Sequence, residues 1–553
     1  MTKETKKIKP AESAYNYQLL IKHILRTPLI YSPDQEIVYR DLKRYTYRDF
    51  AKRVARLANT LAGLGVEPGQ TVAVMDWDSH RYLECFFAIP MMGAVLHTIN
   101  IRLTSEQLIY TINNAEDDVI LVNSEFLPML EAVKDRFETV KKIVLISDEP
   151  DAPETELALD GEYEQLLADS AEEYDFPDFD EDSVATTFYT TGTTGLPKGV
   201  FFTHRQLVLH TYAIMSSYCG YHTQAKLDSA DVYMPITPMF HVHAWGVPYL
   251  MTMLGAKQVY PGRYEPDKLL ELHEKEKVTF SHCVPTILHM LLTSHASEKT
   301  DLSGWKVIIG GAALPRGLAK TAMERGINVY AGYGMSETCP VLTVANLKPH
   351  MLDWDMEKQL DVRCRTGLPV PNAYVEIADP GGKLLPHDGK STGEVIVRTP
   401  WLTQGYIKDP EKSEELWENG WLHTGDIGFI DTEGYLQITD RLKDVIKSGG
   451  EWISSLELED IVSRHEAVSE SAVIGIPDEK WGEVPMALLV LKDEYKGRVT
   501  EDEIRDHYAQ YVGQGVIPKY GIPRRIEFVG EIPKTSVGKL DKKNLRKQYE
   551  SSG

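Results

Sequence analysis

Stretches with the pattern of β-strands alternate with stretches that have the pattern of α-helices over most of this chain. Phe50, Val54, Leu57 and Leu61 recur at helical spacing, and the apolar run 71–75 that follows has the length of a buried strand. The same alternation continues to about residue 331. Because strands separated by helices pair in parallel, it predicts doubly wound α/β sheets covered by helices on both faces.

The expected strands and helices can be placed from these patterns. Strands are expected at 36–39, 71–75, 119–122, 143–146, 185–189, 233–236, 257–260, 279–283, 306–309 and 328–331. Helices are expected at 19–26, 205–215, 247–254 and 266–275, and Thr104-Ser105-Glu106-Gln107 predicts a capping box that opens another. Glycines follow the strands that end at 189, 309 and 331. Since ligands gather at the carboxyl ends of such strands, these three ends predict one nucleotide cleft.

The chain is too long for one hydrophobic core, because it has 553 residues. From about Pro369, short strands such as 375–378, 393–398 and 435–438 are separated by glycine turns, which indicates a small β-rich subdomain. We therefore predict a large N-terminal domain, residues 1–440, made of two α/β subdomains and this β-rich part. Residues 441–553 are predicted to form a small α+β domain.

Charge and cysteine usage limit the partners and the compartment. A net charge of −23 argues against nucleic acid or an anionic membrane as the main partner. The 16 acidic residues between Asp148 and Asp182, without a lysine or arginine, are expected to form a solvated segment. The apolar run Cys85–Leu96 is shorter than the roughly 20 residues of a membrane span. Five scattered cysteines and no signal peptide predict a cytoplasmic protein.

The segment from Tyr189 to Gly199 has the composition of a phosphate-binding loop. It contains Thr190, Thr191, Gly192, Thr193, Thr194, Gly195 and Lys198. Glycines let backbone N–H groups approach an anion, threonines add donors, and Lys198 adds a positive charge. The spacing differs from that of the P-loop. A flexible surface loop is the alternative.

Tyr333-Gly334-Met335-Ser336-Glu337-Thr338 forms a second motif. Its Gly334 allows close backbone approach, and Glu337 offers a hard oxygen ligand for Mg²⁺. An acidic residue at a helix N-terminus is the alternative interpretation of Glu337.

In this order, these motifs resemble those of the adenylate-forming superfamily, which includes acyl-CoA synthetases, firefly luciferase and the adenylation domains of peptide synthetases. The further matching segments are Pro238–Trp245, Thr424-Gly425-Asp426, Asp440–Asp444, Ile446–Ser454 and Pro533–Lys539. The likeness covers nearly the whole chain. It is strongest to medium- and long-chain fatty acid–CoA ligases, through Met239-Phe240-His241 with Trp245 and through 447–454.

The resemblance implies a role for each matching residue. Lys539 would be the adenylation lysine, with Lys198, His241 and Glu337 as the other catalytic groups, and Thr190 with Glu337 would bracket Mg²⁺. The nucleotide site would include residues 190–195, Lys198, Gly311, Ala312, Gly332, Tyr333, Gly334, Ser336, Thr338, Asp426, Arg441, Lys443 and Lys539. His241, Trp245, Gly311 and Gly334 would line the acyl pocket, with Trp245 as its gate, and Lys447, Gly449, Gly450 and Trp452 would meet CoA. His243 matches nothing in the family and is expected to be packed locally.

The family's reaction implies ATP and CoA as co-substrates. A carboxylic acid attacks the α-phosphate of ATP to give acyl-AMP and pyrophosphate, and a thiol then displaces AMP. Medium- or long-chain fatty acids are the expected acids, while short thioether propionates such as 3-methylmercaptopropionate and aryl acids are alternatives. Two rival functions are a ligase that donates to a carrier protein and an inactive nucleotide-binding protein.

Residues 1–40 carry apolar positions that must be buried somewhere. They are Tyr17, Leu19, Leu20, Ile24, Leu25, Leu29, Ile30 and Tyr31. The segment either packs on its own domain or forms an interface. Because the resembled synthetases dimerise through their N-terminal region, we expect a homodimer.

Overall fold

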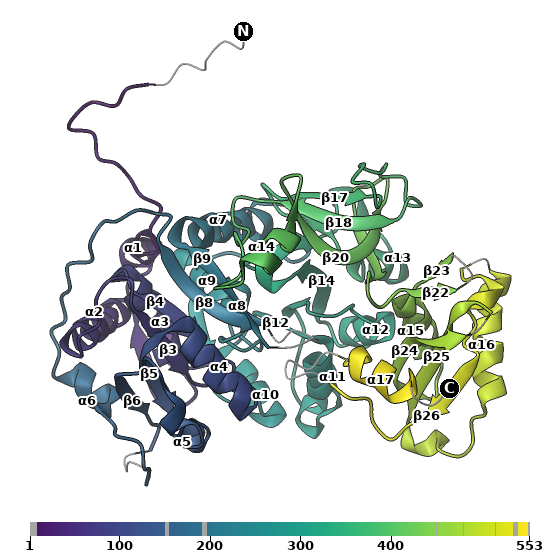
Figure 1. The fold of residues 1–553 in the computed structure, drawn as a ribbon, viewed down its shortest axis with the longest axis horizontal. Coiled ribbons are helices and arrows are strands. Elements are labelled where there is room, and N and C mark those ends of the chain that lie inside the picture. Colours follow the sequence, from purple (N-terminus) through teal and green to yellow (C-terminus); the bar gives the residue numbers. More distant parts are fainter. Residues whose placement is uncertain are drawn as a thin grey trace.

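Four β-sheets organise the part of the chain that the structure describes, which is residues 8–149, 154–190, 196–448, 451–478, 480–514, 516–534 and 540–550 of a computed structural model (Figure 1). The seven-stranded sheet has the order β7 (Gly161–Glu162), β6 (Lys142–Ile146), β5 (Asp117–Asn123), β3 (Thr71–Met75), β4 (Val95–Thr98), β8 (Val184–Thr190), β9 (Lys198–Thr203). Its strands are parallel except for β9, which returns antiparallel to β8.

The nine-stranded sheet contains the other two glycine-marked strand ends. Its order is β16 (Leu368–Pro369), β15 (Val341–Val344), β14 (Asn328–Gly334), β13 (Lys306–Ile309), β12 (Phe280–Cys283), β10 (Val232–Tyr233), β11 (Lys257–Tyr260), β1 (Glu36–Tyr39), β2 (Lys43–Thr46). The six strands from β14 to β1 are parallel, as the alternation predicted.

Helices cover both α/β sheets. They are α1 (Lys22–Tyr31), α2 (Tyr47–Gly63), α3 (His80–Met91), α4 (Ser105–Ala115), α5 (Leu127–Glu131), α6 (Tyr163–Ala168), α7 (His204–Gly220), α8 (Val242–Trp245), α9 (Val247–Leu254), α10 (Pro266–Glu276), α11 (Pro285–Thr293), α12 (Arg316–Glu324) and α13 (Met356–Arg363). The capping box predicted at Thr104 is present on α4. Phe86 of α3 stacks on Tyr249 of α9 at 5.5 Å between ring centroids, and both side chains are fully buried. Each such aromatic contributes about 1.5–3 kcal/mol by burial.

Two smaller sheets follow. The β-rich part has the order β17 (Tyr374–Ala378), β18 (Gly393–Arg398), β20 (Trp421–Ile430), β19 (Trp417–Glu418), with β21 (Leu436–Arg441) on β20 and helix α14 (Pro410–Leu416) beside it. The C-terminal part has β23 (Glu451–Ile453), β22 (Ile446–Ser448), β25 (Gly482–Leu491), β24 (Val468–Asp478), with β26 (Arg525–Phe528) on β25 and helices α15 (Ser455–Ser463), α16 (Glu501–Gly513) and α17 (Lys542–Glu550). A large α/β part is thus followed by a smaller α+β part, as expected (Figure 1).

The bounds of several predicted elements were wrong. The strand expected at 328–331 continues to Gly334, because its last residues pair antiparallel with β15. The strand expected at 233–236 is limited to Val232–Tyr233. The helix expected at 19–26 begins at Lys22 and runs to Tyr31, even though it contains Pro28.

Most acidic residues of the segment are exposed, as predicted, but some of them also form ion pairs with the large domain. Arg81, whose side chain is 7% exposed, donates to Asp148 at 2.8 Å and to Glu164 at 3.0 Å. Arg53 donates to Glu164 through two bonds of 2.8 Å. These partners lie 67 to 111 positions away along the chain, so the local sequence could not show them.

Among the described residues, no helix combines the length and the hydropathy that crossing a bilayer requires.

Candidate active site

The ends of β8 and β9 bring the first two predicted site residues together. Thr190 is the last residue of β8 and pairs directly with Lys198, the first residue of β9. Both side chains are half-buried. Thr191, Gly192, Thr193, Thr194 and Gly195 connect the two strands and lie outside the described residues.

Lys198 and Glu337 meet through a residue that the sequence did not single out. The Nζ of Lys198 lies 4.5 Å from the ring centroid of Tyr406, and the Tyr406 hydroxyl donates to Glu337 Oε1 at 2.8 Å. Tyr406 and Glu337 are each 8% exposed. Burial, reinforced by the Glu337 carboxylate, raises the pKa of Tyr406 well above its ordinary value, so this hydroxyl stays a donor.

Close backbone packing explains the glycines of the second motif. A Cβ added to Gly334 would lie 1.8 Å from the carbonyl oxygen of Pro340, and one added to Gly332 would lie 3.0 Å from Ile308 Cγ2. Ser336, Glu337 and Thr338 follow in a single 3₁₀ turn. Ser336 is half-buried, whereas Thr338 is fully buried and receives the Met335 N–H at 3.0 Å. The Thr338 hydroxyl therefore stabilises the turn itself.

Asp426 lies between Tyr333 and Arg441. The Tyr333 hydroxyl donates to Asp426 Oδ2 at 2.6 Å, and Arg441 Nε donates to Oδ1 at 2.9 Å. Asp426 is 2% exposed, so its charge is compensated by these two partners rather than by bulk water. The same carboxylate raises the pKa of Arg441, and burial followed by Asp426 raises that of Tyr333. Three predicted nucleotide residues from β14, β20 and β21 thus form one connected group.

The turn after β13 faces Trp245. A Cβ added to Gly310 would lie 2.8 Å from Trp245 Cη2, so the indole lies directly over this glycine. Gly311 has a positive φ of 76°, which favours glycine, and Ala312 beside it is exposed. Predicted nucleotide and acyl residues are therefore neighbours at this strand end.

A left-handed turn carries the predicted gate. Val242, His243, Ala244 and Trp245 have φ values of 49°, 54°, 46° and 60°, and Gly246 continues the turn at 74°. Consecutive residues with this backbone are rare, especially a β-branched valine. His241, directly before the turn, is half-buried and interacts with its surroundings. The turn directs the Trp245 indole toward β13, leaving it 8% exposed.

Three buried histidines lie in or beside this turn. His282 lies 4.8 Å from the Trp245 ring, His243 binds Thr186 Oγ1 at 2.7 Å, and His210 receives the Val341 N–H at 3.3 Å. Burial lowers the pKa of each to about 3, so all three are neutral near pH 7. His243 packs against Phe86 and Phe188, as the sequence predicted for it. His210 and His282 were missed, because nothing in the sequence marks them.

Asp78 supports the segment that precedes His241. Its Oδ1 accepts the Met239 N–H at 2.8 Å, and its Oδ2 accepts the Tyr264 hydroxyl at 2.5 Å. Asp78 is 3% exposed, and burial raises its pKa to about 8. No pattern in the sequence marks this contact, which spans 161 positions.

The segment around Lys443 joins the β-rich sheet to the C-terminal part. Leu442 N–H donates to the Gly425 carbonyl at 2.9 Å, and the Lys443 carbonyl accepts from Arg546 of α17 at 2.9 Å. Before it, the buried Asp440 carboxylate accepts the Ser455 N–H at 2.5 Å.

The predicted CoA residues are only partly described. Lys447 and Trp452 pair through their backbones in the β22–β23 hairpin, and their side chains are outside the described structure. Gly449 and Gly450 between them, and Lys539 near the C-terminus, also lie outside the described residues.

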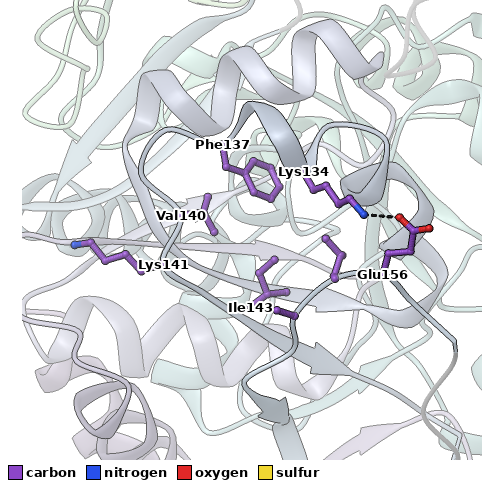
Figure 2. Close-up of a pocket in the computed structure, with 8 residues that line it drawn as sticks. Lys134, Phe137, Val140, Lys141, Ile143 and Glu156 are labelled. Atoms are coloured by element: carbon purple, nitrogen blue, oxygen red, sulfur yellow. Dashed lines mark hydrogen bonds and ion pairs between the residues drawn. The ribbon is translucent and has the colours of Figure 1, made fainter.

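Two surface hollows lie away from this constellation. Figure 2 shows one of about 220 Å³ beside β6, where Lys134 pairs with Glu156. The other, of about 770 Å³, lies at the amino-terminal ends of β3, β4 and β8, near Thr71, Val95 and Val184. Neither is lined by a predicted site residue.

Family models match both parts of the chain. Residues 31–407 match the AMP-binding enzyme model, and residues 457–539 match the model of the AMP-binding enzyme C-terminal domain.

Three of the similar proteins are CoA ligases, and each match covers nearly the full length of both chains. The long-chain-fatty-acid–CoA ligase of Thermus thermophilus is 41% identical, covering 94% of this chain and 93% of that protein. The 3-methylmercaptopropionyl-CoA ligase of Ruegeria lacuscaerulensis is 35% identical over 97% and 98%. Among solved structures, an anthranilate CoA ligase in complex with anthranoyl-AMP superposes with a TM-score of 0.82 at 25% identity, covering 96% of this chain and 98% of that one.

Proposed function

This chain belongs to the AMP-binding enzyme family and is an AMP-forming acid–CoA ligase, and we propose that its acid is a medium- or long-chain fatty acid. ATP, CoA and a carboxylic acid are its substrates. The observation that supports a fatty acid is the buried position of Trp245, whose indole lies over Gly310 and beside the neutral, buried His282. An alkyl chain enters such a region without leaving a charge unpaired.

We propose that the first step is attack of the acid's carboxylate on the α-phosphate, with pyrophosphate as leaving group. Lys198 would stabilise the charge that develops on the phosphates, and Lys539 would bridge the carboxylate and the α-phosphate. The Asp426 carboxylate would accept hydrogen bonds from the ribose hydroxyls, while Tyr333 and Arg441 hold it in place. Gly311, Ala312, Gly332, Gly334 and Ser336 would line the adenylate, and His241 would lie beside its carbonyl.

We propose that the second step is attack of the CoA thiol on the acyl carbonyl, which releases AMP. Here AMP is a far better leaving group than the oxide that the free acid would have to lose. Lys447, Gly449, Gly450 and Trp452 would meet the pantetheine arm. The small domain, from 441 to 553, would turn about Lys443 between the two steps. This boundary is supported by the change of sheet between β21 and β22.

The donor set is suited to Mg²⁺ that arrives with ATP. Mg²⁺ prefers oxygen ligands, keeps several waters, and is usually held by one or two protein oxygens plus phosphates. Thr190 and Glu337 offer a hydroxyl and a carboxylate, and within the described ranges no group of three or more His, Cys, Asp or Glu side chains could hold a metal alone. When bound, Mg²⁺ would neutralise phosphate charge. Glu337 and Thr190 would hold it.

A panel of acids tests the proposed substrate. CoA consumption would be compared for butyrate, octanoate, palmitate, 3-methylmercaptopropionate and benzoate. We expect the highest kcat/KM with octanoate or palmitate. A maximum with 3-methylmercaptopropionate, the acid named for the Ruegeria relative, or with benzoate would overturn the fatty-acid proposal and keep the ligase.

A further inference from the structure

Tyr406 contacts both Lys198, the proposed phosphate ligand, and Glu337, the proposed Mg²⁺ ligand, yet it is distant from both in the sequence. The Ile407 N–H donates to the Gly199 carbonyl at 2.8 Å, and Tyr406 forms a β-bridge with Val200. The backbone of Tyr406 is thereby fixed to β9, the strand that begins at Lys198.

The same segment is also fixed to the glutamate. The Thr403 N–H donates to the Glu337 carbonyl at 3.0 Å, and the Thr403 hydroxyl donates to Phe201 O at 3.0 Å. Backbone bonds therefore hold Tyr406 between the two groups independently of its own side chain.

The side chain of Tyr406 then contacts both groups with different surfaces. Its hydroxyl donates to one oxygen of Glu337, and the face of its ring lies under the Lys198 ammonium. Among the ion pairs of the described residues, none joins Lys198 or Glu337 to an opposite charge. A lysine and a glutamate this close to a shared ring would otherwise be free to pair directly, which would withdraw both from a ligand.

We propose that Tyr406 is a positioning residue for adenylation, which keeps Lys198 and Glu337 apart and oriented, the first toward phosphate and the second toward Mg²⁺. This rests on the proposed function, since it assumes the roles given there to Lys198 and Glu337. The Tyr406 hydroxyl orients the Glu337 carboxylate by a hydrogen bond, and the Tyr406 ring holds the Lys198 ammonium by a cation–π contact.

Tyr406→Phe separates the two contacts, because it keeps the ring and removes the hydroxyl. With octanoate as acid, we expect pyrophosphate exchange to fall about 10- to 100-fold, the range for a hydrogen bond to a charged group. The Mg²⁺ concentration for half-maximal exchange should rise. Conversion of preformed octanoyl-AMP and CoA into octanoyl-CoA should stay at the wild-type rate, because that step does not use the phosphate contacts.

Binding measurements give a readout besides turnover. Calorimetric titration of ATP with and without Mg²⁺ should show that Mg²⁺ improves ATP affinity less in Tyr406→Phe than in the wild type. Tyr406→Leu, which also removes the ring, should weaken ATP binding in both conditions. Tyr374→Phe is the matched control, since Tyr374 is 67% exposed on β17, and it should match the wild type throughout.

The proposal would be overturned if Tyr406→Phe had the same pyrophosphate exchange rate and Mg²⁺ dependence as the wild type. It would also be overturned by an equal loss in both half-reactions, because that result indicates a structural role. Lys198→Ala and Glu337→Gln, measured alongside, separate this from the proposed function. If they lose exchange while Tyr406→Phe does not, only the role of Tyr406 fails. If they retain it, the assignment of the whole site fails.

Discussion

Trp245 is the residue whose replacement tests the acyl pocket most directly. We expect Trp245→Ala to change the preference for acid chain length while the KM for ATP stays nearly constant, because removal of the indole that lies over Gly310 would open space there. Replacing a buried tryptophan by alanine costs about 3–5 kcal/mol of stability in any case. The measurement is therefore the ratio of kcat/KM values across saturated acids.

Trp305→Ala is the control for this loss of packing. Trp305 is 2% exposed and belongs to a separate apolar cluster at the start of β13. It should lower the melting temperature without altering the chain-length profile. An unaltered profile in Trp245→Ala as well would identify Trp245 as a core residue only.

The raised pKa of Asp78 leads us to expect that the stability of the protein depends on pH. Its pKa in the folded protein is raised to about 8, so between its unfolded value and pH 8 the unfolded chain releases a proton that the folded chain retains. Stability therefore falls as pH rises through this window, by at most about 1.4 kcal/mol per pH unit. Asp78→Asn keeps the shape and cannot ionise. Its melting temperature should fall less between pH 5 and pH 8, and an identical fall in both proteins would contradict the prediction.

Gly334 determines how two strands meet, since the end of β14 lies against the residue that precedes β15 with almost no space. Gly334→Ala places a carbon 1.8 Å from the backbone oxygen of Pro340, which cannot rotate away as a side chain can. We expect the free energy of unfolding to fall by at least about 3 kcal/mol. We also expect adenylation activity to be lost. Gly220→Ala, where nothing lies within 4 Å, should stay within about 0.5 kcal/mol of the wild type. Comparable melting curves for the two variants would count against this account.

Strands and helices with strong periodicity could be predicted from the sequence, and contacts between distant segments could not. The predictions at Thr71–Met75, Val247–Leu254 and Lys306–Ile309 match the structure to the residue, because each has turn signals at both ends. The left-handed turn at Val242–Trp245 was missed, since its side chains carry no signal for positive φ. Tyr406 was missed because its bond to Glu337 spans 69 positions.

The two-step reaction predicts that the small domain affects one half-reaction more than the other. Lys539→Ala should lose most adenylation and still convert preformed acyl-AMP and CoA into thioester, because Lys539 would serve only the first arrangement. Pyrophosphate exchange and thioester formation are measured on one preparation. Equal losses would rule out the alternation of the domain.

The surface near the N-terminus bears on assembly. Leu20, Ile24 and Leu25 are buried within the chain itself, so part of the segment packs on its own domain. Ile30 and Tyr31, in contrast, are 63% and 81% exposed at the end of α1. We propose that they contribute to a homodimer interface, as exposed apolar groups at a two-fold contact would.

Tyr31→Glu should therefore shift a dimer toward monomers in light scattering at micromolar concentration. Tyr374→Glu, at a position that is 67% exposed on β17, should leave the assembly unchanged. If the wild type is a monomer, the proposed interface is wrong. If Tyr31→Glu is still a dimer, the interface must lie elsewhere.

The hydrogen bonds on either side of Lys443 bear on how the molecules divide between the two proposed arrangements of the small domain. Ser454 donates to the Thr439 carbonyl and Ser455 to the Asp440 carboxylate, so both bonds connect the two sides of the proposed pivot. The proposed rotation at Lys443 would break them and expose a carboxylate whose pKa burial has raised. The fraction of molecules in each arrangement then depends on what replaces these bonds, and each 1.4 kcal/mol changes that ratio about tenfold. Asp440 would thus shift the equilibrium between the two arrangements of the small domain through a bond to Ser455.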